Sequence, residues 1–285
     1  MSQIDLHTHT TASDGTLDPA DLVRKAASDG LKAVAITDHD TVGGLSQALR
    51  AGKETGVEVI PGCELSIDFK SGQMHILGLF LPDPPQGLQA TLDDLQDRRN
   101  NRNDRILGML RDAGVDVTLK EIQELAGEAS IGRPHIARVL VQKGVVESID
   151  QAFKQYIGPG GAAYVPKDKL DPETAIRILK QEGATVILAH PYSLEIDTEE
   201  LRELLSRLKE QGLEGVEAYY SEHTPEQTRT YLQLCSELDL LVSGGSDFHG
   251  SVKEDVGLGT GKGNLDLSYD LVRRMRQARG ETPSS

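Results

Sequence analysis

The sequence predicts an α/β fold in which a parallel sheet closes into a barrel, or a barrel-like sheet, with helices between its strands. Short apolar runs such as 33–37 and 185–189 alternate with amphipathic segments that begin at helix-capping residues, which is typical of β-α-β units. Polar residues follow these runs at their C-terminal ends, as Asp38 and His190 do. An open doubly wound sheet would gather such residues at one switch point, whereas a barrel distributes them over many strand ends.

Length and composition fit one large soluble domain or two smaller ones, because the chain has 285 residues, 38% of them hydrophobic and 26% charged. The net charge of −15 argues against a surface that coats duplex DNA or RNA. It leaves room for a small phosphorylated nucleotide or the end of a short oligoribonucleotide. Cys63 and Cys235 form no CxxC pair, and neither a secretion signal nor a long apolar run is present. We therefore expect a reducing, cytoplasmic location and no membrane partner.

The first part of the barrel is expected over residues 1–82. Asp18 caps the first helix, Pro19 occupies its first position, and Gly30 ends it. A second helix runs to about Thr55. The strands predicted for this part are 4–6, 33–37, 57–67 and 74–81.

The alternation of strands and helices stops over residues 83–161, where no strand is evident, and we expect a helical insertion there. Its helices are predicted at 88–113, from a capping box at 118–121, from 132–135, and at 148–156. The barrel resumes over residues 162–285. The strands predicted for this second part are 185–189, 215–219 and 240–243, with helices at 171–182, 198–211, 224–238 and 267–279.

Histidines and carboxylates at the predicted strand ends suggest a metal site. His7 and His9 lie on one face of the first strand, because side chains alternate along a strand, and Asp14 sits in a tight turn that can fold back toward them. Five further candidates follow later strands or lie near their ends, and His75 falls at a strand start; together they are His39, Glu64, His75, His190, Asp247 and His249. A strand-start histidine such as His75 can also be an ordinary buried group.

The types and number of these side chains indicate more than one metal ion. Imidazole and carboxylate ligands without thiolate pairs suit Mn²⁺, Fe²⁺ or Zn²⁺, and nine candidates exceed the four to six ligands that one such ion takes. We therefore expect two or three divalent ions, Mn²⁺ first, bridged by a carboxylate such as Glu64. Neighbouring ions of this kind are the usual device for hydrolysing phosphate esters.

The ordered motifs resemble the PHP family, the polymerase and histidinol phosphatase phosphoesterases. They are Asp5-Leu6-His7-Thr8-His9, Ser13-Asp14-Gly15, Ile36-Thr37-Asp38-His39-Asp40, Gly62-Cys63-Glu64, His75, Ala189-His190-Pro191 and Gly245-Ser246-Asp247-Phe248-His249. The resemblance implies a distorted (β/α)7 barrel of the TIM type with a trinuclear site. It implies one ion on His7, His9, Glu64 and Asp247, a second on Glu64, His75 and His190, and a third on Asp14, His39 and His249. Asp38 and Asp40 are expected to orient His39 or a metal-bound water.

The insertion resembles the subgroup that hydrolyses 3′,5′-nucleoside bisphosphates, whose close relatives trim 5′ nucleotides from short RNA. The residues that carry this likeness are Gly132-Arg133-Pro134-His135-Ile136-Ala137 and Tyr164-Val165-Pro166-Lys167. Arg133 offers a bidentate fork and His135 a second donor for a second phosphate at a helix N-terminus, so the insertion is interpreted as a lid. Lys167 and His223 are further candidates for substrate contact. Arg133, His135 and His223 could equally be ordinary surface or capping residues, and Lys167 is the weakest candidate of the four.

The predicted function is therefore hydrolysis of the 5′-phosphate of a 3′,5′-nucleoside bisphosphate, such as 3′-phosphoadenosine 5′-phosphate, by a metal-bound hydroxide. The first alternative is a 5′-3′ exoribonuclease on short 5′-phosphorylated RNA. Histidinol-phosphate phosphatase is the next, and an amidohydrolase-type enzyme is disfavoured because that class usually bridges its metals with a carboxylated lysine. A catalytically silent PHP module is the alternative from outside the enzymes, and the complete ligand set argues against it.

Overall fold

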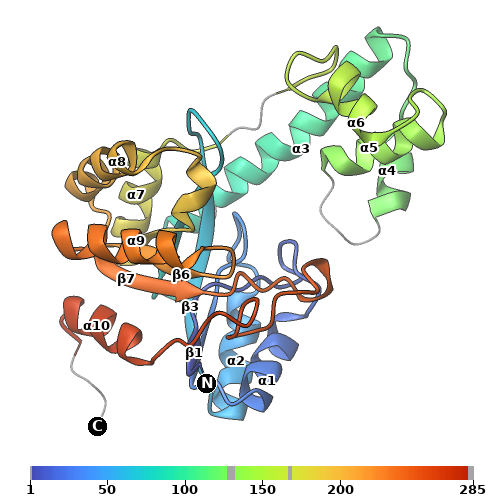
Figure 1. Ribbon diagram of the computed structural model, residues 1–285. Coiled ribbons are helices and arrows are strands. Elements are labelled where there is room, and N and C mark those ends of the chain that lie inside the picture. Colours follow the sequence, from blue (N-terminus) through green and yellow to red (C-terminus); the bar gives the residue numbers. More distant parts are fainter. Residues whose placement is uncertain (1, 127–131, 166–168, 282–285) are drawn as a thin grey trace. The chain divides into compact units, whose positions relative to one another are not determined.

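The computed structural model describes residues 2–126, 132–165 and 169–281, except for the side chains of residues 98–100. The chain forms two compact units (Figure 1). The barrel unit comprises Met1–Thr91 and Lys169–Ser285, and the helical unit comprises Leu92–Asp168. The insertion expected over residues 83–161 overlaps most of the helical unit. Both of its expected bounds fall earlier in the chain, since the unit begins at Leu92 and ends at Asp168.

Among the described residues, seven strands form one sheet in the order of the chain: β1 (Ile4–Asp5), β2 (Ala33–Ile36), β3 (Glu58–Ile67), β4 (Met74–Leu79), β5 (Thr185–Leu188), β6 (Gly215–Tyr220) and β7 (Leu241–Gly245). The first and last strands also meet. The N–H of Leu6 donates to the carbonyl of Gly244 at 3.2 Å, and the N–H of His9 donates to that of Phe248 at 2.9 Å. The sheet therefore curves into a barrel with helices around it, which confirms the predicted fold class.

One strand runs against the others. β4 pairs antiparallel with both β3 and β5, while the remaining pairs are parallel. The expectation of a wholly parallel sheet is therefore wrong at β4, because residues 68–73 are too few for the crossover that a parallel connection needs. As a result, the start of β4 lies at the same edge of the sheet as the C-terminal ends of its neighbours.

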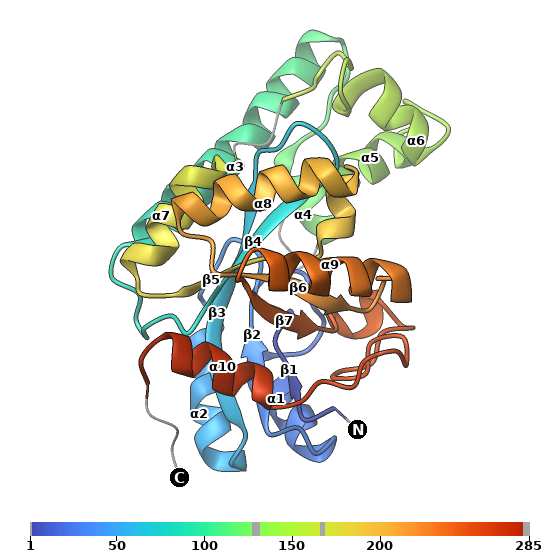
Figure 2. The ribbon, with the colours of Figure 1, turned by 60° about the vertical axis from the view of Figure 1, so that its left-hand side comes forward.

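The helices of the barrel unit are α1 (Pro19–Ser28), α2 (Leu45–Thr55), α7 (Pro172–Gln181), α8 (Thr198–Gln211), α9 (Pro225–Glu237) and α10 (Asp270–Ala278). The predicted cap Asp18 is confirmed, and Asp171 and Thr224 cap the helices expected from 171 and 224 in the same way, since each side chain accepts a backbone N–H of the first turn. α9 lies along β6 and β7 (Figure 2). Inside the sheet, the strands contribute a core of fully buried residues that includes Ile4, Leu6, Ile60, Leu77 and Ile187.

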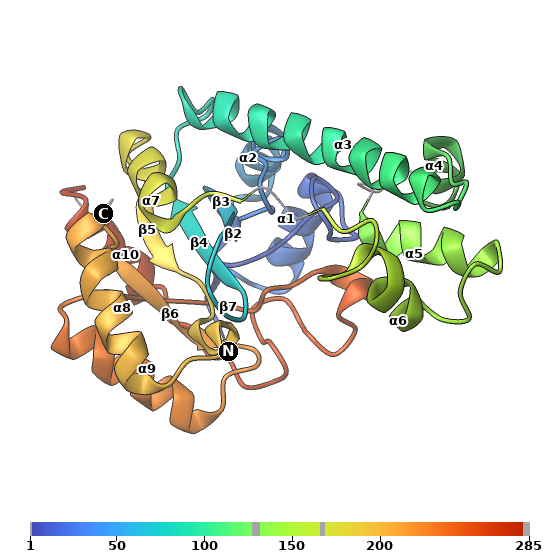
Figure 3. The same ribbon diagram turned by 90° about the horizontal axis from the view of Figure 1, so that it is seen from above.

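The helix α3 (Leu88–Asp112) begins in the barrel unit and continues into the helical unit. The helical unit adds α4 (Leu119–Ala126), α5 (Arg133–Gln142) and α6 (Ile149–Ala152), and a π-helical turn follows at Phe153–Ile157. Its own apolar core joins these helices to the second half of α3 (Figure 3), through buried residues that include Ile106, Leu110, Ile122, Ile136 and Ile157. Across the described ranges, we find no helix whose length and apolar character would suit a membrane span.

Candidate metal centre

The strand ends bring together all nine residues that the sequence suggested as metal ligands, here called the ligand cluster. Their donor atoms form four overlapping groups in which every atom lies within 4.8 Å of the others. The groups are His9, Asp14, His39 and His249; His7, Glu64 and His190; His7, His9 and Asp247; and His39, Glu64 and His75. His75 joins them because β4 is antiparallel, so that its first residues lie at the ligand edge of the sheet.

Glu64 lies at the centre of the ligand cluster, and its two oxygens face different histidines. Oε1 is 2.9 Å from Nδ1 of His75 and 3.1 Å from Nε2 of His190. Oε2 is 3.2 Å from the Nε2 atoms of both His7 and His9 and 3.0 Å from Nδ1 of His39. A carboxylate surrounded in this way has the arrangement of a bridging ligand.

The more exposed part of the ligand cluster is formed by Asp14, His39 and His249. Asp14 lies 3.3 Å from Nε2 of His249 and 3.9 Å from Nε2 of His39. Gly15 allows the turn after Asp14 to fold back, because a Cβ at this position would lie 2.3 Å from the carbonyl oxygen of His9.

The positions of the donor atoms suit coordination of metal ions better than hydrogen bonding within the ligand cluster. The Nε2 atoms of His7 and His9 face each other at 3.1 Å. Among the described residues, Nδ1 of His9, Nδ1 of His39 and Oε2 of Glu64 are buried polar atoms that make no hydrogen bond of suitable geometry, although the last two lie only 3.0 Å apart. Unpaired buried polar atoms are costly and rare, so several in one cluster indicate that a cation completes their coordination. The set of imidazoles and carboxylates suits divalent ions.

The electrostatics of the ligand cluster keep its carboxylates charged. Burial would raise the pKa of Glu64, but the nearby imidazoles of His39, His7 and His75 hold it well below its ordinary range. Burial would lower the pKa of His7, but Glu217, Glu64 and Asp247 raise it well above the usual value. The carboxylates are therefore available as anionic ligands at neutral pH.

Glu217 is a buried residue of the site that the sequence analysis missed. Its Oε1 lies 3.0 Å from Nδ1 of His7, and its Oε2 accepts the backbone N–H of His190 at 2.8 Å. The contact between Glu217 and Nδ1 of His7 orients the imidazole so that its Nε2 faces the ligand cluster. The available signal was an acidic residue inside the apolar strand Gly-Val-Glu-Ala-Tyr-Tyr, since an acid is seldom fully buried without a partner.

Asp5 is a second missed residue, although it belongs to the first motif. It is fully buried and accepts the backbone N–H groups of Ser246 at 2.8 Å, Gly259 at 2.7 Å and His7 at 3.3 Å. Asp5 thereby ties the end of β1 to the loop after β7. Close approach of these strands also requires Gly245, because a Cβ there would lie 2.3 Å from Cβ of His7.

Asp38 and Asp40 hold the loops that carry ligands. Asp38 accepts hydrogen bonds from the backbone N–H of Thr10 at 2.7 Å and from the hydroxyl of Ser13 at 2.6 Å, next to Asp14. Asp40 accepts the backbone N–H and the hydroxyl of Ser66, both at 2.8 Å. These bonds place the two aspartates around the ligand cluster, while their expected action on His39 or on a water stays a prediction.

Two ligand candidates have unusual backbone conformations. His190 and Asp247 both have positive φ, at 22° and 56°, although neither is glycine. Such conformations are costly and persist only where the surroundings determine them. Each residue lies two positions after a strand of the barrel, β5 for His190 and β7 for Asp247, so the unusual backbone conformation sets the direction of a ligand side chain just beyond the strand end.

Arg133 and His135 begin α5 in the helical unit and already have partners there. Arg133 donates to the carbonyl of Ile157 at 3.2 Å, and its guanidinium lies 5.6 Å and 5.8 Å from the ring centres of Phe153 and Tyr164. Nδ1 of His135 accepts the backbone N–H of Gly132 at 3.2 Å. Their expected role as a phosphate clamp therefore stays a prediction, and Lys167 lies outside the described residues.

His223 lies next to the end of β6 in an aromatic group. Its Nδ1 lies 3.0 Å from the carbonyl of Ala218 and so donates to it, and burial lowers the pKa of the imidazole. A neutral imidazole in this tautomer offers Nε2 only as an acceptor, which does not favour a phosphate oxygen as its partner. Tyr192, Tyr220 and Tyr231 surround the ring at centroid distances of 4.8–5.5 Å.

Known proteins resemble this chain over most of its length. The model of the PHP domain matches residues 5–242. A 5′-3′ exoribonuclease of Haemophilus influenzae is 36% identical over 245 residues, covering 86% of this chain and 89% of the relative. A 3′,5′-nucleoside bisphosphate phosphatase of Chromobacterium violaceum is 29% identical over 260 residues, covering 90% of this chain and 91% of the relative.

A solved structure resembles this chain in its fold over almost the full length of both proteins. It comes from Bifidobacterium adolescentis and is assigned as a metal-dependent phosphoesterase. It matches with a TM-score of 0.76 and 30% sequence identity, covering 99% of this chain and 97% of the other.

Proposed function

Because the chain belongs to the PHP domain family, we propose that it hydrolyses a phosphate ester of a nucleotide that carries phosphate on both the 5′ and the 3′ oxygen of its ribose. The chain is a phosphoric ester hydrolase of this family. The observation that carries the proposal is the ligand cluster around Glu64, whose oxygens face five histidines.

The ligand cluster would hold two or three divalent ions, with Mn²⁺ as the first candidate and Fe²⁺ or Zn²⁺ as alternatives. Its nine members are His7, His9, Asp14, His39, Glu64, His75, His190, Asp247 and His249. Bound ions of this kind supply Lewis-acid polarisation of phosphoryl oxygens and make water more acidic.

The chain's own contribution is to orient the ligands. Glu217 holds His7 in the tautomer that presents Nε2, and Ser193 does the same for His190, whose Nδ1 lies 2.8 Å from the serine hydroxyl. His7 and Glu64 are almost completely buried, which excludes water from their side of the site. Electrostatic interactions are stronger in such surroundings.

The proposed substrate rests on the charge of the chain and on the activities for which its relatives are named. The net charge of −15 favours a small substrate over a long nucleic acid. The Chromobacterium relative is named for nucleoside bisphosphates, and Arg133 is a partly exposed guanidinium suited to a second phosphate. A 5′-3′ exoribonuclease activity is the alternative, which the higher identity to the Haemophilus relative favours.

The test compares substrates under one set of conditions. Phosphate release is measured from 3′-phosphoadenosine 5′-phosphate, 5′-AMP and histidinol phosphate, with Mn²⁺ and after chelation, and nucleotide release is measured from short 5′-phosphorylated RNA. Preference for the bisphosphate, lost on chelation, supports the proposal, and the monophosphate product tells which ester is cleaved. Preference for RNA supports the alternative, and no turnover of any substrate contradicts both.

The role of Arg133 is tested separately. Arg133→Ala is expected to weaken transition-state binding of the bisphosphate by about 2–3 kcal/mol and to leave a generic aryl phosphate unaffected, because only the bisphosphate offers a second charged group. Arg138→Ala is the matched control, since Arg138 is an exposed arginine on the same helix. An equal loss on both substrates would contradict the clamp.

A further inference from the structure

The two oxygens of Asp247 face different surroundings. Oδ1 faces the ligand cluster, at 3.1 Å from Nε2 of His9 and 3.3 Å from Nδ1 of His249. Oδ2 points away from those imidazoles and accepts the hydroxyl of Tyr220 at 2.7 Å. The ammonium of Lys253 reaches the same Oδ2 at 2.5 Å. Asp247 therefore presents one oxygen to the ligand cluster, and a tyrosine and a lysine share the other.

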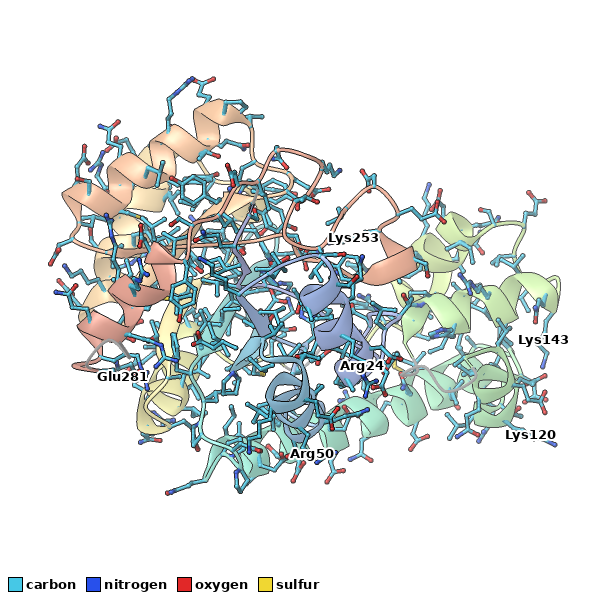
Figure 4. The ribbon with its side chains drawn as sticks, turned by 90° about the horizontal axis from the view of Figure 1, so that it is seen from below. Arg24, Arg50, Lys120, Lys143, Lys253 and Glu281 are labelled. Carbon is cyan, nitrogen blue, oxygen red and sulfur yellow. The ribbon has the colours of Figure 1, made fainter. Side chains whose placement is uncertain are left out.

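Backbone hydrogen bonds determine the position of Lys253. It follows a short 3-10 turn, Gly250–Val252, in the loop after β7 (Figure 4). The N–H of Ser251 donates to the hydroxyl of Thr16 at 3.0 Å, and the N–H of Thr16 donates to the carbonyl of His249 at 3.2 Å. These bonds join the loop of Lys253 to the loop of Asp14. Lys253 is thus held beside the ligand cluster.

Exposure shows from which side a substrate can arrive. The side chains of His7 and Glu64 are at most 1% exposed. Asp14 is 56% exposed, His39 23% and Lys253 34%. The ligand cluster is therefore open to solvent at Asp14 and His39, and Lys253 is exposed on the loop that is bonded to the loop of Asp14. Lys253 is the cation among them, and it keeps N–H groups beyond the one used on Asp247.

Lys262, another cation near this loop, is already paired with acidic residues. Lys262 lies 3.1 Å from Glu222 and 3.0 Å from Asp255, and neither acid belongs to the ligand cluster. Lys253 instead shares its acceptor with Tyr220, whose hydroxyl donates to Oδ2 of Asp247 at 2.7 Å. Oδ2 of Asp247 thus keeps a hydrogen-bond donor when Lys253 moves away.

We propose that Lys253 is a substrate-binding residue whose ammonium moves from Asp247 to the non-bridging oxygens of the phosphoryl group to be hydrolysed. Ions held by the ligand cluster would share the charge of Asp247 and so weaken its attraction for the lysine, and a phosphate would offer the ammonium several anionic oxygens. Lysine is a common phosphate ligand that acts as a point charge on a flexible stem. This assignment rests on the proposed phosphoesterase chemistry but requires no particular nucleotide.

The test measures binding of inorganic phosphate to Mn²⁺-loaded protein by titration calorimetry, beside the metal content of each variant. Lys253→Gln is expected to raise the Kd for phosphate about tenfold or more, the usual scale for losing a charge-assisted contact, with the Mn²⁺ content unchanged. Lys253→Arg should restore most of the affinity. Lys262→Gln is the matched control and should bind phosphate like the unaltered protein.

Two results would overturn the assignment. Unchanged phosphate affinity in Lys253→Gln would show that the lysine does not bind phosphate. A loss of Mn²⁺ with normal phosphate affinity per loaded site would show that it only positions Asp247. Failure of the unaltered protein to hydrolyse bisphosphate or RNA would refute the proposed substrates, while the phosphate titration would still decide the role of Lys253.

Discussion

Glu217 offers a sharp test of the metal centre, because its two oxygens serve two different donors. Nδ1–H of His7 lies 3.0 Å from Oε1 and 3.2 Å from Oε2, and Oε2 also accepts the backbone N–H of His190 at 2.8 Å. Glu217→Gln keeps the shape of the side chain but replaces one acceptor with an NH2 donor. In either orientation, the amide NH2 meets an N–H group that a carboxylate oxygen accepts in the unaltered protein.

The size of the effect depends on which N–H group the amide nitrogen faces. If the amide nitrogen faces His190, a buried N–H has no acceptor, which costs about 1–3 kcal/mol of the free energy of unfolding. If it faces His7, Nδ1–H keeps only the longer contact to the other oxygen, or Nδ1 becomes the acceptor, in which case Nε2 carries the proton and cannot bind an ion. Loss of an orienting partner of this kind weakens metal binding about 10–100-fold, or about 1.4–2.7 kcal/mol.

Two measurements separate these outcomes: Mn²⁺ affinity by titration calorimetry, and urea unfolding of the metal-free protein. Glu214→Gln is the matched control, because Glu214 precedes the same strand, accepts the backbone N–H of Val186 at 2.9 Å and pairs with Lys180 rather than with the ligand cluster. Its Mn²⁺ affinity should be normal. If Glu217→Gln shows both normal Mn²⁺ affinity and normal stability, the reasoning is refuted.

Two further predictions concern stability and thiol chemistry. Glu182 accepts the backbone N–H groups of Gln86 at 2.8 Å and Leu88 at 2.7 Å at the start of α3, and these bonds lower its pKa against the opposing effect of burial. Glu182→Ala should therefore cost about 1 kcal/mol in urea unfolding, against a negligible change for the exposed Gln181→Ala. The native state favours the ionised form of Glu182, so its contribution to the free energy of unfolding should be complete above the ordinary carboxyl pKa of 4.5. It should disappear as the pH falls through the lowered pKa of the native state. A contribution of Glu182 that does not change with pH would contradict this prediction. Burial raises the pKa of both thiols, to about 12 for Cys235, so neither Cys63 nor Cys235 should react with a disulfide reagent at pH 8 until urea is added, and rapid native labelling of either would be contrary evidence.

Most of the ligand cluster was predictable because its signals are local in the sequence. His7 and His9 need only the alternation of a strand, and residues such as His39 need only a strand end before them. The C-terminal ends of parallel strands meet at one edge, so local signals become neighbours in space. His75 was the exception, since its place depends on the reversed direction of β4. The short connection over residues 68–73 already excluded a parallel crossover, so this reversal could have been inferred.

The orienting residues could not be predicted in the same way. The contact of Glu217 with His7 spans 210 positions of the chain, and no local pattern pairs an acid inside a strand with one particular imidazole. Lys253 is similar, because its loop has no regular period and is placed by Thr16 on a distant segment. The ligands follow from secondary structure, whereas their partners depend on how the strands pack.

The proposed roles of Lys253 and Arg133 predict that their loss reduces the free energy of binding for different sets of substrates. Lys253 would act on the phosphoryl group at the ligand cluster, so its loss should weaken every phosphate ester, including the aryl phosphate. Arg133, in the helical unit, would act on a second phosphate, so its loss should weaken the bisphosphate alone. If the two cations bind different phosphates, their effects on the bisphosphate should add in the double variant, within about 0.5 kcal/mol for independent sites. A clearly smaller combined loss would mean that both cations serve one phosphate, and the second-phosphate role of Arg133 would then be wrong.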